Sequence, residues 1–247
     1  MKKYYELIML VIANYTEANS YKQFIDEYWY YFIEYIKKKN YNIKVFLLFG
    51  GKKPENIPIH DEDIIISNTK ESFIPGILEK SLYALNYCNN NFDYKHILRT
   101  NISSFYVIDE LINAQKKLPL NNVYMGITNG WFIAGCGIWF SKDIVQFIID
   151  NIDKIPISNE KNILSCDNKP IPNIDDVVLG NFFKEHKNII QHFNTRFNYK
   201  FNLKENKLTI LKQIIKEKHY YIRLKNGRKR EEDAKMASFL TNHFYKS

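Results

Sequence analysis

The sequence is poor in the residues that break or cross-link a chain. Its 247 residues include only 9 Gly, 7 Pro and 3 Cys. Cys88, Cys136 and Cys166 are odd in number, lie far apart and form no Cys-x-x-Cys pair, which argues against a disulfide framework and against a zinc site. The scarcity of glycine and proline excludes a low-complexity chain. We expect a compact protein that works in a reducing compartment.

A long hydrophobic run is also missing. The apolar stretch at residues 7–13 follows Glu6 and is far shorter than the ~20 residues that span a bilayer. We interpret it as a buried first strand rather than a signal peptide. The sequence therefore predicts no transmembrane segment and a cytoplasmic location, with attachment to a membrane surface only through a partner or a surface patch.

Apolar and aromatic residues are abundant, at 45% and 15% of the chain, so it can bury a substantial core. Short apolar runs alternate with longer amphipathic ones, which is typical of an α/β domain with a largely parallel sheet. Strands are expected at residues 7–13, 44–49, 63–67, 94–99, 123–128, 131–140, 189–193 and 219–224. Helices are expected at residues 21–39, 72–87, 107–118, 142–152, 175–186 and 233–244, with one more after residue 199. A polar turn is expected at residues 100–104.

Positive charge is concentrated near the C-terminus. The formal net charge is +8, and residues 200–230 alone contain eleven Lys or Arg and two Glu, so the first 199 residues are close to neutral. We expect one domain over residues 1–198 and a basic C-terminal extension, residues 199–247, that packs on it. Such a segment suits a phosphate-bearing partner or an anionic surface, and a solvated basic tail is the plain alternative.

Nucleic acid is not the expected partner. A nucleic-acid surface would interleave basic residues with exposed aromatic ones. The aromatic residues of this chain fall mostly in apolar periodic runs, as at Phe24, Tyr28, Phe32 and Tyr35, where a core position is expected.

Several short motifs follow one another in a distinctive order. They are DIII at 63–66, KESF at 70–73, a helix with Leu78, Lys80 and Ser81, the strand and loop at 94–106, YMG at 124–126, GCGIWFS at 135–141 and IDDVVLG at 174–180. Together with Trp29, they resemble the motifs of the β1,3-galactosyltransferase and fringe family. The resemblance extends over roughly residues 5–193.

The resemblance implies a GT-A fold, a Rossmann-like and mostly parallel sheet flanked by helices that binds a nucleoside diphosphate sugar. It implies inverting transfer of a hexose, with a UDP-sugar favoured as donor and a glycan or glycoconjugate as acceptor. Such a reaction needs a general base and positive charge for the departing diphosphate. Asp176 is the candidate base and Asp175 its neighbour. The same two residues also suit the cap and first turn of a helix, and both roles are compatible.

Candidates for donor binding lie at polar strand ends and in the basic segment, because ligands of open α/β sheets bind beyond the carboxyl ends of the strands. Tyr15 is a candidate for stacking on the nucleobase. Arg223 and Lys225 are expected on one face of a strand, where they can hold the diphosphate oxygens, or else form an exposed basic strand. The full set is Ala13, Asn14, Tyr15, Lys80, Arg99, Thr100, Asn101, Ser103, Arg223, Lys225 and Arg228.

Acceptor candidates lie in the middle of the chain. Trp131 can offer an apolar platform to a sugar ring, although a core position is the competing interpretation. Gly135 and Gly137, on either side of Cys136, allow backbone to approach an acceptor closely.

The sequence departs from the family at the metal loop. Family members carry Asp-Asp-Asp or Asp-x-Asp where this chain has Asn101-Ile102-Ser103. A hard divalent cation prefers carboxylate oxygens. Asn101, Ser103 and His219 are therefore weak metal candidates. We expect that Mn²⁺ or Mg²⁺ can bind but is not obligatory, with Arg99 and the basic segment supplying charge instead.

The same substitution supports a second hypothesis, in which the chain is a catalytically inactive glycosyltransferase-like module that binds a nucleotide or a glycan. A third hypothesis is binding to an anionic surface through the C-terminal segment.

Overall fold

The centre of the molecule is a six-stranded mixed sheet with strand order β3-β2-β1-β4-β9-β6. The computed structural model describes residues 2–165, 168–184, 206–225 and 230–246. Four strands are parallel: β1 (Lys3–Ile12), β2 (Ile43–Gly50), β3 (Ile64–Ser67) and β4 (Phe92–Asn101). Strand β9 (Ile138–Ser141) runs antiparallel to β4, and β6 (Tyr124–Met125) runs antiparallel to β9. The predicted α/β class with a mostly parallel sheet is confirmed.

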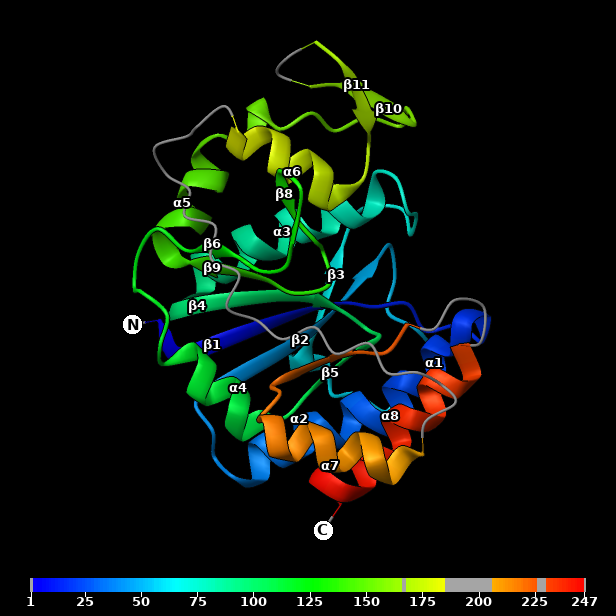
Figure 1. Ribbon diagram of the computed structural model, residues 1–247. Coiled ribbons are helices and arrows are strands. Elements are labelled where there is room, and N and C mark those ends of the chain that lie inside the picture. The colour runs from blue at the N-terminus through cyan, green and yellow to red at the C-terminus, as the bar shows by residue number, and fades with distance from the viewer. Residues whose placement is uncertain (1, 166–167, 185–205, 226–229, 247) are drawn as a thin grey trace.

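Helices cover both faces of this sheet (Figure 1). One face packs against α3 (Gly76–Asn91), α5 (Lys142–Asp150) and α6 (Asp175–Lys184). The other packs against α1 (Tyr21–Phe24), the π-helical turn η2 (Ile25–Trp29), α2 (Tyr30–Lys38), α4 (Ile108–Gln115), α7 (Lys207–Glu217) and α8 (Arg230–Phe244). Because alternate side chains of β1 enter the two hydrophobic clusters, the strand is apolar along almost its whole length, as expected of a buried parallel strand. No helix in the described ranges is long and apolar enough to cross a bilayer.

Three predicted segments differ from expectation. The strand expected at 131–140 is interrupted: β7 (Thr128–Asn129) and β8 (Phe132–Ile133) form a hairpin around Gly130, which has a φ of +68°, and β9 begins only at Ile138. The hairpin packs on α6, where a Cβ at Gly180 would lie 2.3 Å from the Cβ of Phe132, so this approach requires glycine.

The polar turn expected at 100–104 is shorter than predicted. Strand β4 continues to Asn101, and only two residues separate it from β5 (Ser104–Tyr106). The helix expected from residue 72 starts at Gly76, because the Ser72 hydroxyl binds within the preceding turn, accepting from the Gly76 amide at 3.1 Å and donating to the Ile74 carbonyl at 3.0 Å.

The short elements complete the description. They are the 3₁₀ turns η1 (Ala18–Ser20), η3 (Asp61–Asp63) and η4 (Ile152–Lys154), and a hairpin of β10 (Asn162–Leu164) with β11 (Pro170–Pro172), which the sequence did not predict. The strand expected at 189–193 lies outside the described residues.

The C-terminal segment enters the same core as the sheet. Strand β12 (Tyr221–Arg223) pairs antiparallel with β5, with Tyr221 opposite Tyr106 and Arg223 opposite Ser104. Ile210 and Leu240, from α7 and α8, join the hydrophobic cluster on that face. The segment carries a basic charge, but many of its apolar side chains are core residues.

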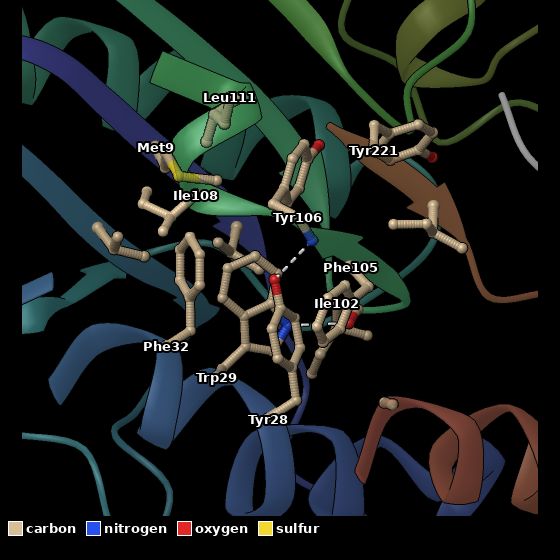
Figure 2. Close-up of a cluster of buried hydrophobic side chains, with 14 of the residues drawn as sticks. Met9, Tyr28, Trp29, Phe32, Ile102, Phe105, Tyr106, Ile108, Leu111 and Tyr221 are labelled. Carbon is tan, nitrogen blue, oxygen red and sulfur yellow. Dashed lines mark hydrogen bonds between the residues drawn. The ribbon is translucent and has the colours of Figure 1, made fainter. Parts of the chain in front are cut away.

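A group of aromatic residues in this cluster holds the turn between β4 and β5 (Figure 2). The Trp29 indole donates to the Ile102 carbonyl at 2.8 Å, and the Tyr106 amide donates to the Tyr28 hydroxyl oxygen at 2.9 Å. The Tyr245 hydroxyl donates to the Tyr106 carbonyl. Buried side chains thus satisfy backbone groups that the very short β5 leaves without strand partners.

We expect the Ile222→Ala variant to lose roughly 2–5 kcal/mol of unfolding free energy, because Ile222 is fully buried between β5 and the core. Ile215→Ala is the matched control: Ile215 is 51% exposed on α7, and its truncation should cost little. Urea denaturation of both variants measures the difference. Equal stability of the two would contradict the packing of β12 as part of the core.

Candidate functional site

A cleft of about 630 Å³ opens at the carboxyl ends of β1 and β4. Four segments form its walls: the residues after β1 and the start of α1, the loop before α3, the turn between β4 and β5, and β12 with the start of α8. The lining residues are Ile12, Ala13, Asn14, Asn19, Tyr21, Glu71, Ser72, Phe73, Ile77, Lys80, Asn101, Ile102, Ser103, Arg223, Lys225 and Arg230. Seven predicted donor residues therefore line one cleft: Ala13, Asn14, Lys80, Asn101, Ser103, Arg223 and Lys225.

Positive charge predominates in this cleft. Four lining side chains are cationic, namely Lys80, Arg223, Lys225 and Arg230, against the single carboxylate of Glu71. Desolvation, together with the charges of Arg223 and Arg230, lowers the pKa of the Lys225 ammonium. The cations therefore destabilise one another, and a bound anion would relieve that repulsion.

Arg223 lies directly at the Asn101 turn. Its guanidinium donates to the Asn101 side-chain oxygen and, at 3.3 Å, to the Ser104 hydroxyl. The Ser104 hydroxyl also donates to the Asn101 oxygen, at 3.1 Å. The β5–β12 register explains the contact, because Arg223 is the direct partner of Ser104 in that pairing.

Lys80 is held from several sides. Its side chain is almost fully buried, donates to the Ala13 carbonyl at 3.1 Å and forms an ion pair with Glu71. Glu71 in turn accepts from the Gly50 amide at 2.7 Å. Burial lowers the pKa of Lys80, and the Glu71 carboxylate opposes that shift. Lys80 thus ties the end of β1 to the loop before α3, and Glu71 compensates much of its charge.

The two adjacent aspartates begin α6 and have different surroundings. Asp175 is buried and forms an ion pair with Arg99, which is itself only 3% exposed. Burial raises the pKa of Asp175, and the Arg99 guanidinium opposes this. Asp176 remains partly exposed and accepts from the Gly135 amide at 2.7 Å. Asp176 is therefore the member of the pair that solvent can reach.

Gly135 lies between the arginine and the aspartates. Arg99 donates to its carbonyl, while Asp176 accepts from its amide. A Cβ at this position would lie 2.6 Å from the Arg99 Nη1 and 3.3 Å from the Asp176 Oδ2. Any larger residue would have to displace the buried arginine, so the arrangement requires glycine. Gly137 makes a similarly close approach, because a Cβ at Gly126 would lie 2.5 Å from its carbonyl oxygen.

Cys136 connects the aspartates with the cleft. Its carbonyl accepts from the Thr100 hydroxyl at 2.9 Å and from the Ser104 hydroxyl at 3.2 Å, and Ser104 contacts Arg223. Hydrogen bonds therefore run from Asp176 through residues 135–136 to Ser104 and Arg223. Thr100, Cys136 and the two aspartates belong to this network but are not among the residues that line the cleft.

Other predicted site residues lie elsewhere. Tyr15 does not line the cleft, because its hydroxyl donates to Asp26 at 3.1 Å and to the Asn56 carbonyl at 3.2 Å. Arg99 is likewise absent from the lining, since it is committed to Asp175 and Gly135.

The third metal candidate, His219, and the acceptor candidates do not line the cleft. His219 is buried just before β12, where its Nε2 lies 2.7 Å from the Glu217 carboxylate, and it does not line the cleft. Trp131 is 40% exposed at the tip of the β7–β8 hairpin. Arg228 lies outside the described residues.

Nine lining residues were not among the sequence-based candidates, and they include Tyr21, Phe73 and Arg230. Arg230 belongs to the basic run at 228–230 and Phe73 to the KESF motif, so both had a signal in the sequence. Tyr21 looked only like the first residue of a helix. A second hollow of about 470 Å³, between α4 and α7 and next to Trp139, contains none of the predicted site residues.

Comparison with known proteins adds evidence on the fold. No family model matches the sequence, and no curated protein matches it. The glycosyltransferase GlyE of Streptococcus pneumoniae TIGR4 matches with a TM-score of 0.50 and 13% identity, over 98% of this chain and 64% of that chain. This chain therefore spans less than two thirds of GlyE.

In two other matches, the alignment covers nearly the whole length of both proteins. A glycosyltransferase involved in the glycosylation of the major capsid of PBCV-1 has a TM-score of 0.49 at 10% identity, over 93% of this chain and 98% of that one. An active-site mutant of LgtC has a TM-score of 0.49 at 10% identity, over 94% and 95%. At such low identity, likeness concerns the fold alone. The mixed, mostly parallel sheet flanked by helices matches the GT-A glycosyltransferase fold.

Removing one partner of the Arg99–Asp175 pair should destabilise the protein strongly. Arg99→Met leaves a buried carboxylate unpaired, so we expect a loss of about 3–5 kcal/mol. The double variant Arg99→Met/Asp175→Leu should recover most of it, because no buried charge remains. Lys142→Met, which breaks the exposed pair with Asp93, is the control and should cost about 1 kcal/mol or less. Urea unfolding that gave similar losses for Arg99→Met and Lys142→Met would contradict this.

Proposed function

We propose that this chain is an inverting glycosyltransferase. In this proposal the cleft binds a nucleoside diphosphate sugar, with a UDP-sugar favoured, and the enzyme transfers its hexose to a hydroxyl group of a glycan or glycoconjugate. The observation that carries the proposal is the convergence of Arg223, Lys225 and Arg230 on the Asn101 turn, at the carboxyl ends of β1 and β4. The resemblance to the β1,3-galactosyltransferase and fringe family supports the same reaction class.

Arg223 and Lys225 are the cations best placed for the diphosphate. Lys80 is paired with Glu71, and Arg230 donates to Asp233 at 2.5 Å, so both carry compensated charge. The Arg223 guanidinium can offer two parallel hydrogen bonds to phosphate oxygens. Charge fixed near the bridging oxygen stabilises the negative charge that develops as the bond to the sugar breaks.

We further propose that this leaving-group site needs no divalent cation. The Asn101 side-chain oxygen already accepts from Arg223 and Ser104, and no carboxylate is present at the turn. The buried Ser103 supplies only a neutral hydroxyl. These donors do not fit a hard cation, which prefers anionic oxygens, and the guanidinium places positive charge at the same turn.

Asp176 is the base in this proposal. The acceptor hydroxyl oxygen attacks the anomeric carbon, the bond from that carbon to the diphosphate breaks with its electron pair, and the hydroxyl proton passes to the Asp176 carboxylate. Asp175 does not compete for this role, because it is buried against Arg99. The Gly135 amide orients Asp176 and leaves part of its carboxylate exposed.

Arg223→Ala should weaken binding of a UDP-sugar by roughly 10- to 100-fold, the usual effect of losing hydrogen bonds to a charged group. The affinity of Arg223→Lys should be intermediate, because lysine keeps the positive charge but cannot form the two parallel hydrogen bonds of a guanidinium. Lys212→Ala, on the exposed face of α7, is the control and should bind normally. Calorimetry with and without EDTA tests both the leaving-group site and its independence of a divalent cation. Unchanged binding by Arg223→Ala contradicts the leaving-group site, and loss of binding in EDTA contradicts metal independence.

Asp176→Asn should lower kcat by roughly 10²- to 10⁴-fold, while the KM for the donor changes little. The amide keeps the size of the side chain and an oxygen that can accept from Gly135, but it cannot take the proton. Asp153→Asn, at an exposed position in η4, is the control. Equal turnover by Asp176→Asn and the wild type would exclude this base. Donor binding by the wild type without any transfer would instead favour the non-catalytic module.

A further inference from the structure

The cleft is lined by two chemically different groups of side chains. Arg223, Lys225 and Arg230 contribute positive charge from β12, the residues after it and α8, whereas Phe73 and Ile77 contribute apolar surface from the loop before α3 and from its first turn. A ligand that is anionic throughout would use only the first group. A ligand with an anionic part and an aromatic part would use both.

Phe73 is unusually exposed for this chain. Its side chain is 62% accessible, whereas every other phenylalanine in the described ranges is buried or half-buried. An exposed ring lacks the free energy that burial would provide. A ligand that covers Phe73 in this ligand-sized cleft would therefore be stabilised by the contact.

The backbone on both sides of Phe73 is fixed. Glu71 is anchored by the Gly50 amide and by Lys80, and Ser72 is bonded to Gly76 and Ile74. The ring is therefore presented by a preorganised loop, which lowers the entropy cost of binding a flat ligand.

Asn14 lines the same cleft, directly after Ala13 at the end of β1. Its side-chain amide makes no hydrogen bond to another residue among those the structure describes. A carboxamide offers a donor and an acceptor side by side, which is the pattern that matches the hydrogen-bonding edge of a nucleobase.

We infer that Phe73 is a stacking platform for the nucleobase of the donor and that Asn14 binds the edge of that base. The cleft then selects nucleoside diphosphates over inorganic anions, with base recognition by Phe73 and Asn14 and phosphate recognition by Arg223. This inference rests on the proposed function and specifies how it recognises its substrate. Stacking of a base on an aromatic ring typically strengthens binding by about ten-fold or more.

Calorimetry with UDP, CDP, ADP, GDP and inorganic pyrophosphate tests the inference. The wild type should bind at least one of the four nucleotides ten-fold or more tightly than pyrophosphate. Phe73→Ala should weaken binding of that nucleotide by about ten-fold and leave binding of pyrophosphate unchanged. Phe73→Trp should restore the preference, whereas Phe73→Leu, which is apolar but has no ring, should not. Asn14→Ala should reduce the differences among the four nucleotides.

Two controls separate base from phosphate recognition. Arg223→Ala should weaken the binding of pyrophosphate and of the nucleotide by a similar factor, whereas Phe73→Ala should weaken only the binding of the nucleotide. Tyr83 is 41% exposed on α3 and does not line the cleft. Tyr83→Ala should therefore change neither the affinity for the nucleotide nor that for pyrophosphate. Because Phe73 is exposed, its substitution should not unfold the protein.

The outcomes distinguish this inference from the proposed function. The inference is wrong if no nucleotide binds better than pyrophosphate, or if Phe73→Ala leaves the ratio of the two affinities unchanged. It is also wrong if Phe73→Ala alters only the KM of an acceptor. If the ratio changes as expected but the wild type transfers no sugar, base recognition stands and the proposed catalysis fails. If sugar is transferred and the ratio does not change, the stacking role alone fails.

Discussion

The antiparallel pairing of β12 with β5 is the contact on which the rest of the site depends. It places Arg223 opposite Ser104, and so beside Asn101, although more than a hundred residues separate them in the chain. The same pairing inserts buried residues of the C-terminal segment into the core on one face of the sheet. Formation of the cationic cleft and completion of that core are therefore one event. A chain that lacked this segment would lose Arg223 and Lys225 together with part of its hydrophobic cluster.

A second constraint joins the cleft to the aspartates. Arg99 and Asp176 bind the two sides of Gly135, and the next carbonyl, that of Cys136, accepts from Thr100 and Ser104. This segment is thus fixed by hydrogen bonds at both ends, and a side chain at residue 135 would disrupt it. In the proposed reaction the base and the leaving-group cation must keep a constant separation. A bonded path through backbone and buried side chains supports that better than two independent loops.

The sequence was informative where periodicity or charge carried the signal. Alternation of apolar runs predicted the α/β sheet. The basic run at 219–228 predicted that Arg223 and Lys225 lie on one face of a strand; both line the cleft, but the strand ends at Arg223. The short strand β5 was not predicted, and β8 and β9 were predicted as one continuous strand, because two or three residues show no period. Tyr15 illustrates a different limit: its place after β1 was anticipated, but the direction of its side chain follows from Asp26 and the Asn56 carbonyl, which only the tertiary structure brings near.

The dependence of the Asn101 turn on Arg223 for positive charge has a structural consequence that extends beyond that turn. A metal ion is recruited from solution, whereas Arg223 is delivered by a distant part of the chain. The positive charge at the turn therefore exists only when β12 is docked. A diphosphate that binds Arg223 prefers the docked state, so its binding free energy also stabilises the C-terminal segment. In the proposed enzyme, donor binding and the integrity of the C-terminal core reinforce each other through one guanidinium.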